Sequence, residues 1–107
     1  MNTHTIILAA GKGTRMNTNL PKVMQPLGGM SLIEHVISTA QEISKKITVV
    51  IGHQKNLLKE HLDEIDPVIE TVNQENQLGT AHAVKTASHL IQDDERVLIL
   101  YGDVPLI

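Results

Sequence analysis

The chain has 107 residues, which is enough for one domain with a single core. Its 12 acidic and 9 basic residues are interspersed and give a net charge of −3, which excludes long-range attraction of nucleic acid. No apolar run approaches the roughly 18 residues that a membrane span needs. The absence of cysteine excludes disulfides and thiolate metal sites, and with a polar N-terminus that lacks signal-peptide features it predicts a cytoplasmic protein.

The first predicted element is a strand at 5–10, a short apolar run that leads into a loop at 11–30. We expect this loop to be irregular, because prolines and glycines disfavour regular structure at four positions: Pro21, Pro26, Gly28 and Gly29.

The loop opens with Gly11-Lys12-Gly13-Thr14-Arg15, whose glycines let backbone N–H groups approach an anion closely. Lys12, Arg15 and Lys22 can neutralise that anion, so the sequence predicts a phosphate cradle. The loop fits neither common fingerprint: Met16 stands where a dinucleotide-binding loop has its third glycine, and the chain has no G-x-x-x-x-G-K-[ST]. The alternative is a plain glycine turn with solvated cations.

The rest of the chain alternates helices with strands. Ser31 and Glu34 have the spacing of a capping box, which predicts a helix beginning at Ser31 with Lys45 and Lys46 in its last turn. The same reading predicts strands at 47–51, 68–72 and 97–101, a helix at 54–65 and a helix capped by Thr80. We expect the inner face of this last helix to extend as far as Ile91. The only aromatic residue is Tyr101, so the core must be aliphatic.

This alternation predicts an α/β fold: a Rossmann-like, doubly wound, mainly parallel sheet in three α/β/α layers with right-handed crossovers. In such sheets ligands bind beyond the carboxyl ends of the strands. Segments 8–15, 73–80 and 101–103 all follow predicted strands, so we expect them to gather at one edge and form a site.

Carboxylate and amide side chains stand in two of these segments. Asp103 ends an apolar strand and suits Mg²⁺, although aspartate before Pro105 is also a common turn residue. The amides of Gln74 and Gln77 can pair with the edge of a nucleobase, and 79–80 form a helix N-terminus suited to an anion or a base. The alternative is a polar turn followed by a threonine cap.

The six histidines show no H-x₃-H spacing with a third ligand in view, so we expect structural or surface roles for them. They are His4, His35, His53, His61, His82 and His89.

The pattern Leu8-x-x-Gly11-x-Gly13-Thr14-Arg15-Met16-x₄-Pro21-Lys22 resembles the signature of sugar-phosphate nucleotidyltransferases. With further motifs, the whole chain resembles the first part of the N-acetylglucosamine-1-phosphate uridylyltransferase domain in bacterial bifunctional enzymes of UDP-N-acetylglucosamine synthesis. Those motifs lie at 20–23, 35–37, 52–53, 77–83 and 100–107.

The resemblance implies transfer of uridylyl from UTP to N-acetylglucosamine 1-phosphate, with release of pyrophosphate and no covalent intermediate. It implies that Arg15 and Lys22 are catalytic and that Asp103 holds Mg²⁺. The implied nucleotide- and substrate-binding residues are Leu8, Ala9, Ala10, Gly11, Gly13, Lys22, Gln74, Gln77, Gly79, Thr80, Tyr101, Gly102 and Asp103.

A complete uridylyltransferase domain of this family continues beyond the motif at 100–107, and an acetyltransferase domain follows it. We therefore expect residues 1–107 to be the N-terminal nucleotide-binding part of a truncated domain, carrying the UTP and Mg²⁺ half of the site and inactive by itself. The alternative is a non-catalytic binding or self-associating fragment. An uncovered strand at 97–101 would expose unpaired backbone groups, which predicts a homo-oligomer.

Overall fold

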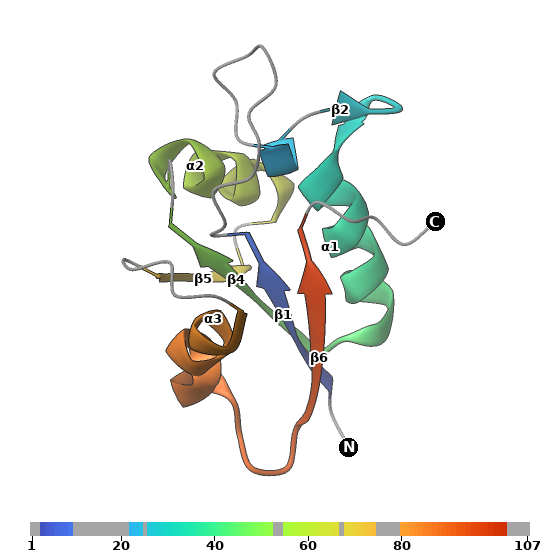
Figure 1. The fold of residues 1–107 in the computed structure, drawn as a ribbon. Coiled ribbons are helices and arrows are strands. Elements are labelled where there is room, and N and C mark those ends of the chain that lie inside the picture. The colour runs from blue at the N-terminus through green and yellow to red at the C-terminus, as the bar shows by residue number, and fades with distance from the viewer. Residues whose placement is uncertain are drawn as a thin grey trace.

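The computed structural model describes residues 3–9, 22–24, 26–52, 55–66, 68–74 and 80–102. At its centre is a four-stranded sheet in the order β5-β4-β1-β6, in which every neighbouring pair is parallel (Figure 1). The strands are β1 (Thr3–Leu8), β4 (Lys46–Ile51), β5 (Glu70–Asn73) and β6 (Arg96–Tyr101). The two central strands, β1 and β4, come from the richest β-branched runs, which suits strands covered on both faces.

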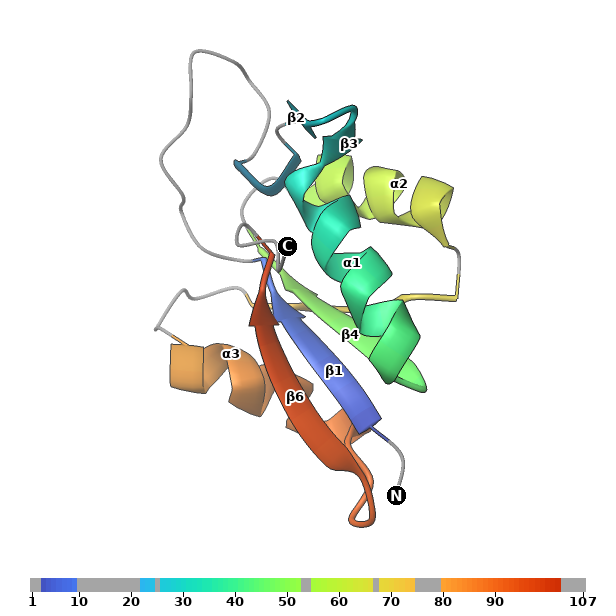
Figure 2. The ribbon, with the colours of Figure 1, turned by 90° about the vertical axis from the view of Figure 1, so that its right-hand side faces the viewer.

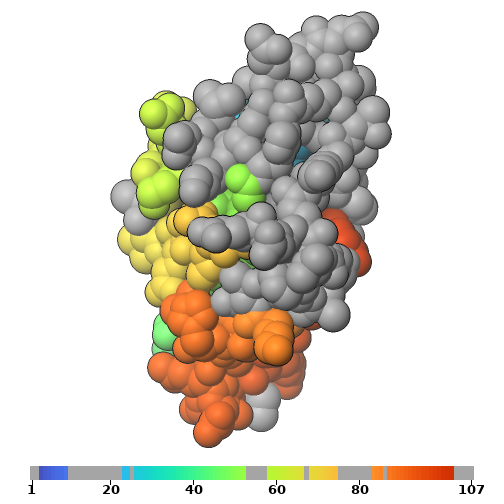
Figure 3. Space-filling view, turned by 60° about the vertical axis from the view of Figure 1, so that its left-hand side comes forward, coloured from blue at the N-terminus to red at the C-terminus, as the bar shows by residue number. Residues whose placement is uncertain are grey.

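Helices cover both faces of the sheet, so the predicted three-layer α/β/α fold is confirmed. The helices α1 (Leu32–Ile43) and α2 (Lys55–Ile65) lie on one face, and α3 (Thr80–Ala87) lies on the other (Figure 2). Alternate residues of β1 serve the two cores: Ile7 packs in the cluster under α1 and α2, whereas Ile6 packs in the cluster under α3. In Figure 3 the yellow surface of β5 lies between α2 and α3.

The start of α1 is fixed by Ser31, as the capping pattern predicts. The Ser31 Oγ accepts a hydrogen bond from the Glu34 backbone N at 3.2 Å. The same hydroxyl lies 2.7 Å from Nε2 of His61 in α2, and the Glu34 carboxylate lies 3.4 Å from that nitrogen. The cap therefore also joins the two helices on this face.

The predicted end of α1 is wrong. The helix stops at Ile43, and Ser44 is already extended, so neither Lys45 nor Lys46 lies in its last turn. Both lysines pair with β1 instead. The Lys45 N donates to the Thr3 O at 2.9 Å, and Lys46 pairs with His4 in the sheet register.

The prediction of irregular structure throughout 11–30 is also wrong where the structure describes that segment. A short 3-10 helix, η1 (Lys22–Met24), is followed by a two-stranded antiparallel hairpin of β2 (Pro26–Leu27) and β3 (Met30–Ser31). Gly28 and Gly29 have φ values of 65 and 88, which a tight two-residue hairpin turn needs and which glycine adopts without strain. The glycines thus build the hairpin.

The helix predicted after Thr80 is shorter than expected. After α3 the chain tightens into a second 3-10 helix, η2 (Ser88–Leu90), before β6 begins. Ile91, expected on the inner face of the helix, lies beyond it but still packs against the core under α3. In the part of the chain that the structure describes, no helix is long and apolar enough to cross a membrane.

Candidate functional site

The strand order creates a switch point between β1 and β6. From β1 the chain moves outward to β4 and β5, and it then returns to the other side of β1 as β6. In parallel α/β sheets the crevice for ligands lies beyond the carboxyl ends of the strands where the order reverses in this way. The carboxyl ends of β1 and β6 therefore define the candidate site.

Backbone hydrogen bonds continue the sheet past the ends of its strands at this edge. The Gly102 N donates to the Leu8 O at 3.0 Å, and the Ala9 N donates to the Val50 O at 2.9 Å. The Gln74 N, just after β5, donates to the Ile51 O at 2.7 Å. Each of these residues is held in a defined place along the edge.

Five of the residues singled out from the sequence are thus described at one edge of the sheet: Leu8, Ala9, Gln74, Tyr101 and Gly102. With neighbouring strands about 4.8 Å apart, the end of β5 is about 14 Å from the end of β6. The side chain of Gln74 is almost fully enclosed, with an exposed fraction of 4%.

The helix η1 packs directly over the switch point (Figure 1). A Cβ built at Gly102 would lie 3.2 Å from Cγ1 of Val23, 3.4 Å from the Leu8 O and 3.5 Å from Cβ of Ala9. Val23 and Ala9 are each only 8% exposed. The backbone of Lys22, the residue before Val23, is therefore held beside the ends of β1 and β6.

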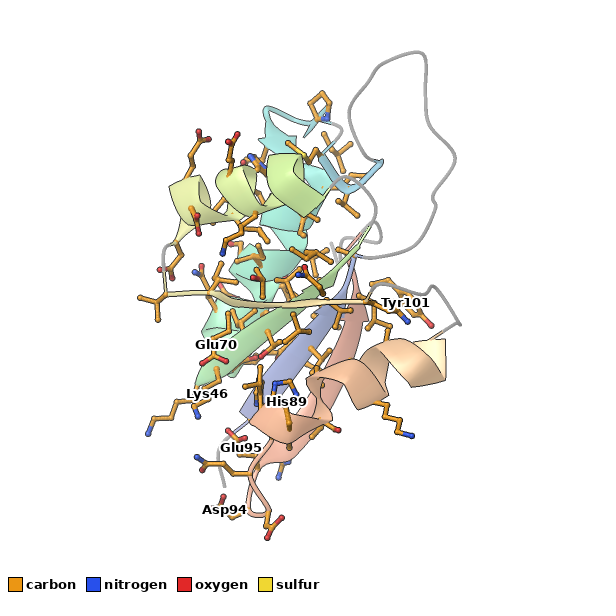
Figure 4. The ribbon with its side chains drawn as sticks, turned by 90° about the vertical axis from the view of Figure 1, so that its left-hand side faces the viewer. Lys46, Glu70, His89, Asp94, Glu95 and Tyr101 are labelled. Carbon is orange, nitrogen blue, oxygen red and sulfur yellow. The ribbon has the colours of Figure 1, made fainter. Side chains whose placement is uncertain are left out.

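Tyr101 lies at the carboxyl end of β6 with half of its surface exposed. It pairs with Leu8 in the sheet register, so both side chains leave the sheet on the α3 face. Figure 4 shows Tyr101 at the end of the sheet away from Lys46 and Glu95.

The remaining residues singled out from the sequence lie outside the described part of the structure. They are Ala10, Gly11, Lys12, Gly13, Arg15, Gln77, Gly79 and Asp103, together with the side chains of Lys22 and Thr80. Thr80 is the first residue of α3.

Sequence reasoning did not identify Val23, which the structure places at the switch point. The available signal was a pair of apolar residues, Val23 and Met24, directly after Lys22 in a segment otherwise rich in polar residues, proline and glycine. Such a pair indicates an anchor in the core, and Met24 does pack against the cluster under α1 and α2.

The opposite, amino edge of the sheet holds a buried polar network around His4, which is 1% exposed. Its Nδ1 lies 3.2 Å from Oε1 of Glu95, and its Nε2 lies 2.6 Å from Oγ1 of Thr48. Oε1 of Glu95 also accepts from the Gln92 N at 2.8 Å. This backbone donor, and then the hydrogen bond from His4, lower the pKa of Glu95.

These contacts give His4 a structural role. His35 also makes a structural contact: its Nε2 donates a hydrogen bond to the backbone O of Leu27 at 2.6 Å. No three His, Asp or Glu side chains among the described residues come together as a metal site.

A hollow of about 530 Å³ also lies at the amino edge, lined by residues that include Lys46, Glu70 and Glu95. These three side chains come from three different strands or their flanks and gather away from Tyr101 (Figure 4). Its lining mixes acids and bases, and it does not reach the switch point.

A parallel sheet of this order, with its crevice between β1 and β6, is the architecture of the nucleotide-diphospho-sugar transferases. The chain belongs to the family of MobA-like NTP transferase domains, whose profile matches residues 5–107. It is 49% identical over 102 residues to the bifunctional protein GlmU of Thermotoga petrophila. The match covers 95% of this chain and 22% of that protein, so the chain spans about a fifth of the length of this relative.

Solved structures share the fold at lower identity. HddC from Yersinia pseudotuberculosis, complexed with GMP-PN, superposes with a TM-score of 0.81 and 22% identity over 96% of this chain and 48% of that one. A manganese complex of Rv0371C from Mycobacterium tuberculosis H37Rv gives a TM-score of 0.76 and 17% identity over 99% of this chain and 53% of that one. The chain thus belongs to an NTP transferase family and shares the fold of these two structures.

Proposed function

We propose that this chain is the UTP- and Mg²⁺-binding part of an N-acetylglucosamine-1-phosphate uridylyltransferase. The reaction joins UTP and N-acetylglucosamine 1-phosphate to give UDP-N-acetylglucosamine and pyrophosphate. One observation carries the proposal: Val23 of η1 packs beside Gly102 at the switch point, which holds the backbone of the preceding residue Lys22 near it, and Asp103 follows Gly102 in the sequence. The identity to GlmU supports the choice of base and sugar.

The chemistry asks the protein mainly to position two anionic reactants. A phosphate oxygen of the sugar phosphate attacks the α-phosphorus of UTP, a new P–O bond forms there, and the bond to the pyrophosphate oxygen breaks. Lys22 and Arg15 would stabilise the charge that develops at the α-phosphate, and backbone N–H groups after β1 would bind the phosphate oxygens. The sugar phosphate is itself the nucleophile, so no side chain needs to form a covalent intermediate.

Asp103 would hold Mg²⁺ through its carboxylate, the hard oxygen ligand that this ion prefers. The residue follows Gly102, whose backbone is bonded to Leu8 at the switch point, so its place in the sequence fits a metal beside the triphosphate. When bound, the ion would screen the negative charge of the triphosphate.

The test is a calorimetric titration of the 107-residue chain with UTP and Mg²⁺, run beside an assay of pyrophosphate release with N-acetylglucosamine 1-phosphate. We expect binding without turnover. Lys22→Ala should weaken UTP binding about 10- to 100-fold, the range for a lost charge-assisted hydrogen bond. Lys45→Ala is the matched control, because Lys45 is exposed at the opposite edge.

Failure of the unmodified chain to bind UTP would refute the proposal, and turnover by the chain alone would refute the assignment of only half a site.

A second proposal concerns self-association. Among the described strands β6 is the last in the sheet order, and three of its apolar side chains are 40–50% exposed on one face: Val97, Ile99 and Tyr101. The helix α3 contacts β1, β4 and β5 on that face. We infer that β6 pairs with β6 of a second copy, because an open apolar edge strand is a template for such pairing. Sedimentation velocity should show a dimer that Ile99→Lys converts to a monomer; a monomer at all concentrations would exclude it.

A further inference from the structure

The short helix η1 is attached to the rest of the molecule by its second and third residues. Val23 is 8% exposed and belongs to the core cluster under α1 and α2, and Met24 packs against the same cluster. The helix also contacts α1. Both apolar side chains therefore enter the core and fix the turn that begins with Lys22.

The contact between Val23 and Gly102 joins η1 to the end of β6. Among the described glycines only Gly28 and Gly29 have positive φ, so the conformation of Gly102 does not itself require glycine. Space is tight there instead: a Cβ would lie 3.2 Å from Cγ1 of Val23, so that Val23 would have to shift by a few tenths of an ångström, and 3.4 Å from the Leu8 O. The missing side chain makes room for Val23.

We propose that Val23 is a positioning residue, which sets the place of Lys22 by packing on the bare backbone of Gly102. This inference rests on the proposed function, in which Lys22 contacts the α-phosphate. Consecutive Cα atoms are only about 3.8 Å apart, so a shift of Val23 also displaces the backbone of Lys22. Misplacement of a catalytic group by about 1 Å is enough to cost about 10²-fold in rate.

The contact also links the two halves of the site. Val23 lies directly after the proposed catalytic lysine, and Gly102 lies directly before the proposed metal ligand Asp103. The packing of Val23 beside Gly102 therefore fixes the two backbone positions next to the proposed catalytic lysine and the proposed metal ligand.

The test is a set of double-mutant cycles on the 107-residue chain, read as the dissociation constant for UTP with Mg²⁺. Val23→Ala should weaken UTP binding about tenfold, equivalent to about 1.4 kcal/mol. In the Lys22→Ala background the same change should have little further effect, because the group that Val23 positions is gone. Val49→Ala is the matched control: Val49 is fully buried in the same cluster but lies within β4, away from the switch point.

A size exchange tests the contact itself. Gly102→Ala should weaken UTP binding, and adding Val23→Ala should restore part of the loss because it removes the methyl group 3.2 Å from the new Cβ. Amide hydrogen exchange at 22–24, measured without nucleotide, should speed up in Val23→Ala and not in Val49→Ala.

Three outcomes distinguish the positioning role of Val23 from the proposed function. Coupling of Val23 to Lys22 together with the size-exchange rescue supports the inference. If Val23→Ala acts additively with Lys22→Ala, or weakens binding no more than Val49→Ala, the inference is wrong while the proposed function stands. If the unmodified chain does not bind UTP, the proposed function fails and this role for Val23 fails with it.

Discussion

Replacing Thr48 with valine should destabilise the protein although Val and Thr have the same shape. Thr48 is fully buried, and its hydroxyl lies 2.6 Å from Nε2 of His4, itself 1% exposed. Nδ1 of His4 must donate to the Glu95 carboxylate, which can only accept, so in the neutral ring Nε2 accepts from Thr48. The valine leaves that nitrogen buried and unpaired, which costs about 1–3 kcal/mol, and the new methyl group offsets a part.

The expected loss is about 1–2 kcal/mol, which lowers Tm by about 5–15 °C in a domain of this size. Thermal unfolding followed by circular dichroism at neutral pH measures it. Thr71→Val is the matched control, a partly buried threonine in β5, and it should change stability by no more than about 0.5 kcal/mol. If the Tm of Thr48→Val equals or exceeds that of Thr71→Val, the hydrogen bond to His4 does not stabilise the fold as argued.

Three further predictions concern stability. Because the pKa of Glu95 lies below its ordinary value of 4.5, its stabilising effect is complete above that pH and lost as the pH falls through the lower folded value. Glu95→Gln should therefore flatten the acid limb of a stability–pH profile, and an unchanged slope would contradict the assignment. Gly29→Ala should cost about 1–2 kcal/mol in urea unfolding from its φ of 88 alone, since nothing lies within 4 Å of the new Cβ; a neutral effect would disprove strain there. Leu62→Ala, at a side chain 1% exposed, should cost about 2–5 kcal/mol by the same assay, and a smaller loss would mean that α2 is not anchored there.

The sheet could be predicted from the sequence because four short runs, three of them nearly continuously apolar and the one at 68–72 alternating, have the pattern of strands. Four such runs separated by helical patterns leave few alternatives to a parallel α/β sheet, and the carboxyl ends of parallel strands must share an edge. For that reason the sequence alone places Leu8, Gln74 and Gly102 along one edge of the sheet.

The failures occurred where tertiary pairing outweighs local preference. Lys45 and Lys46 suit a helix end, but β1 offers them backbone partners from another part of the chain. Proline and glycine at 26–29 were interpreted as breakers, whereas the two glycines form the turn of a hairpin. Val23 could not be predicted as part of the site, because its contact with Gly102 joins segments far apart in the sequence.

The central position of β1 also has a consequence for biosynthesis. One side of this first strand pairs with β4, but its other side pairs with β6, close to the end of the sequence. The chain leaves the ribosome N-terminus first, so one edge of β1 stays unpaired until β6 has emerged. This pairing joins segments far apart in the sequence, so the crevice between β1 and β6 can be completed only after β6 has been translated.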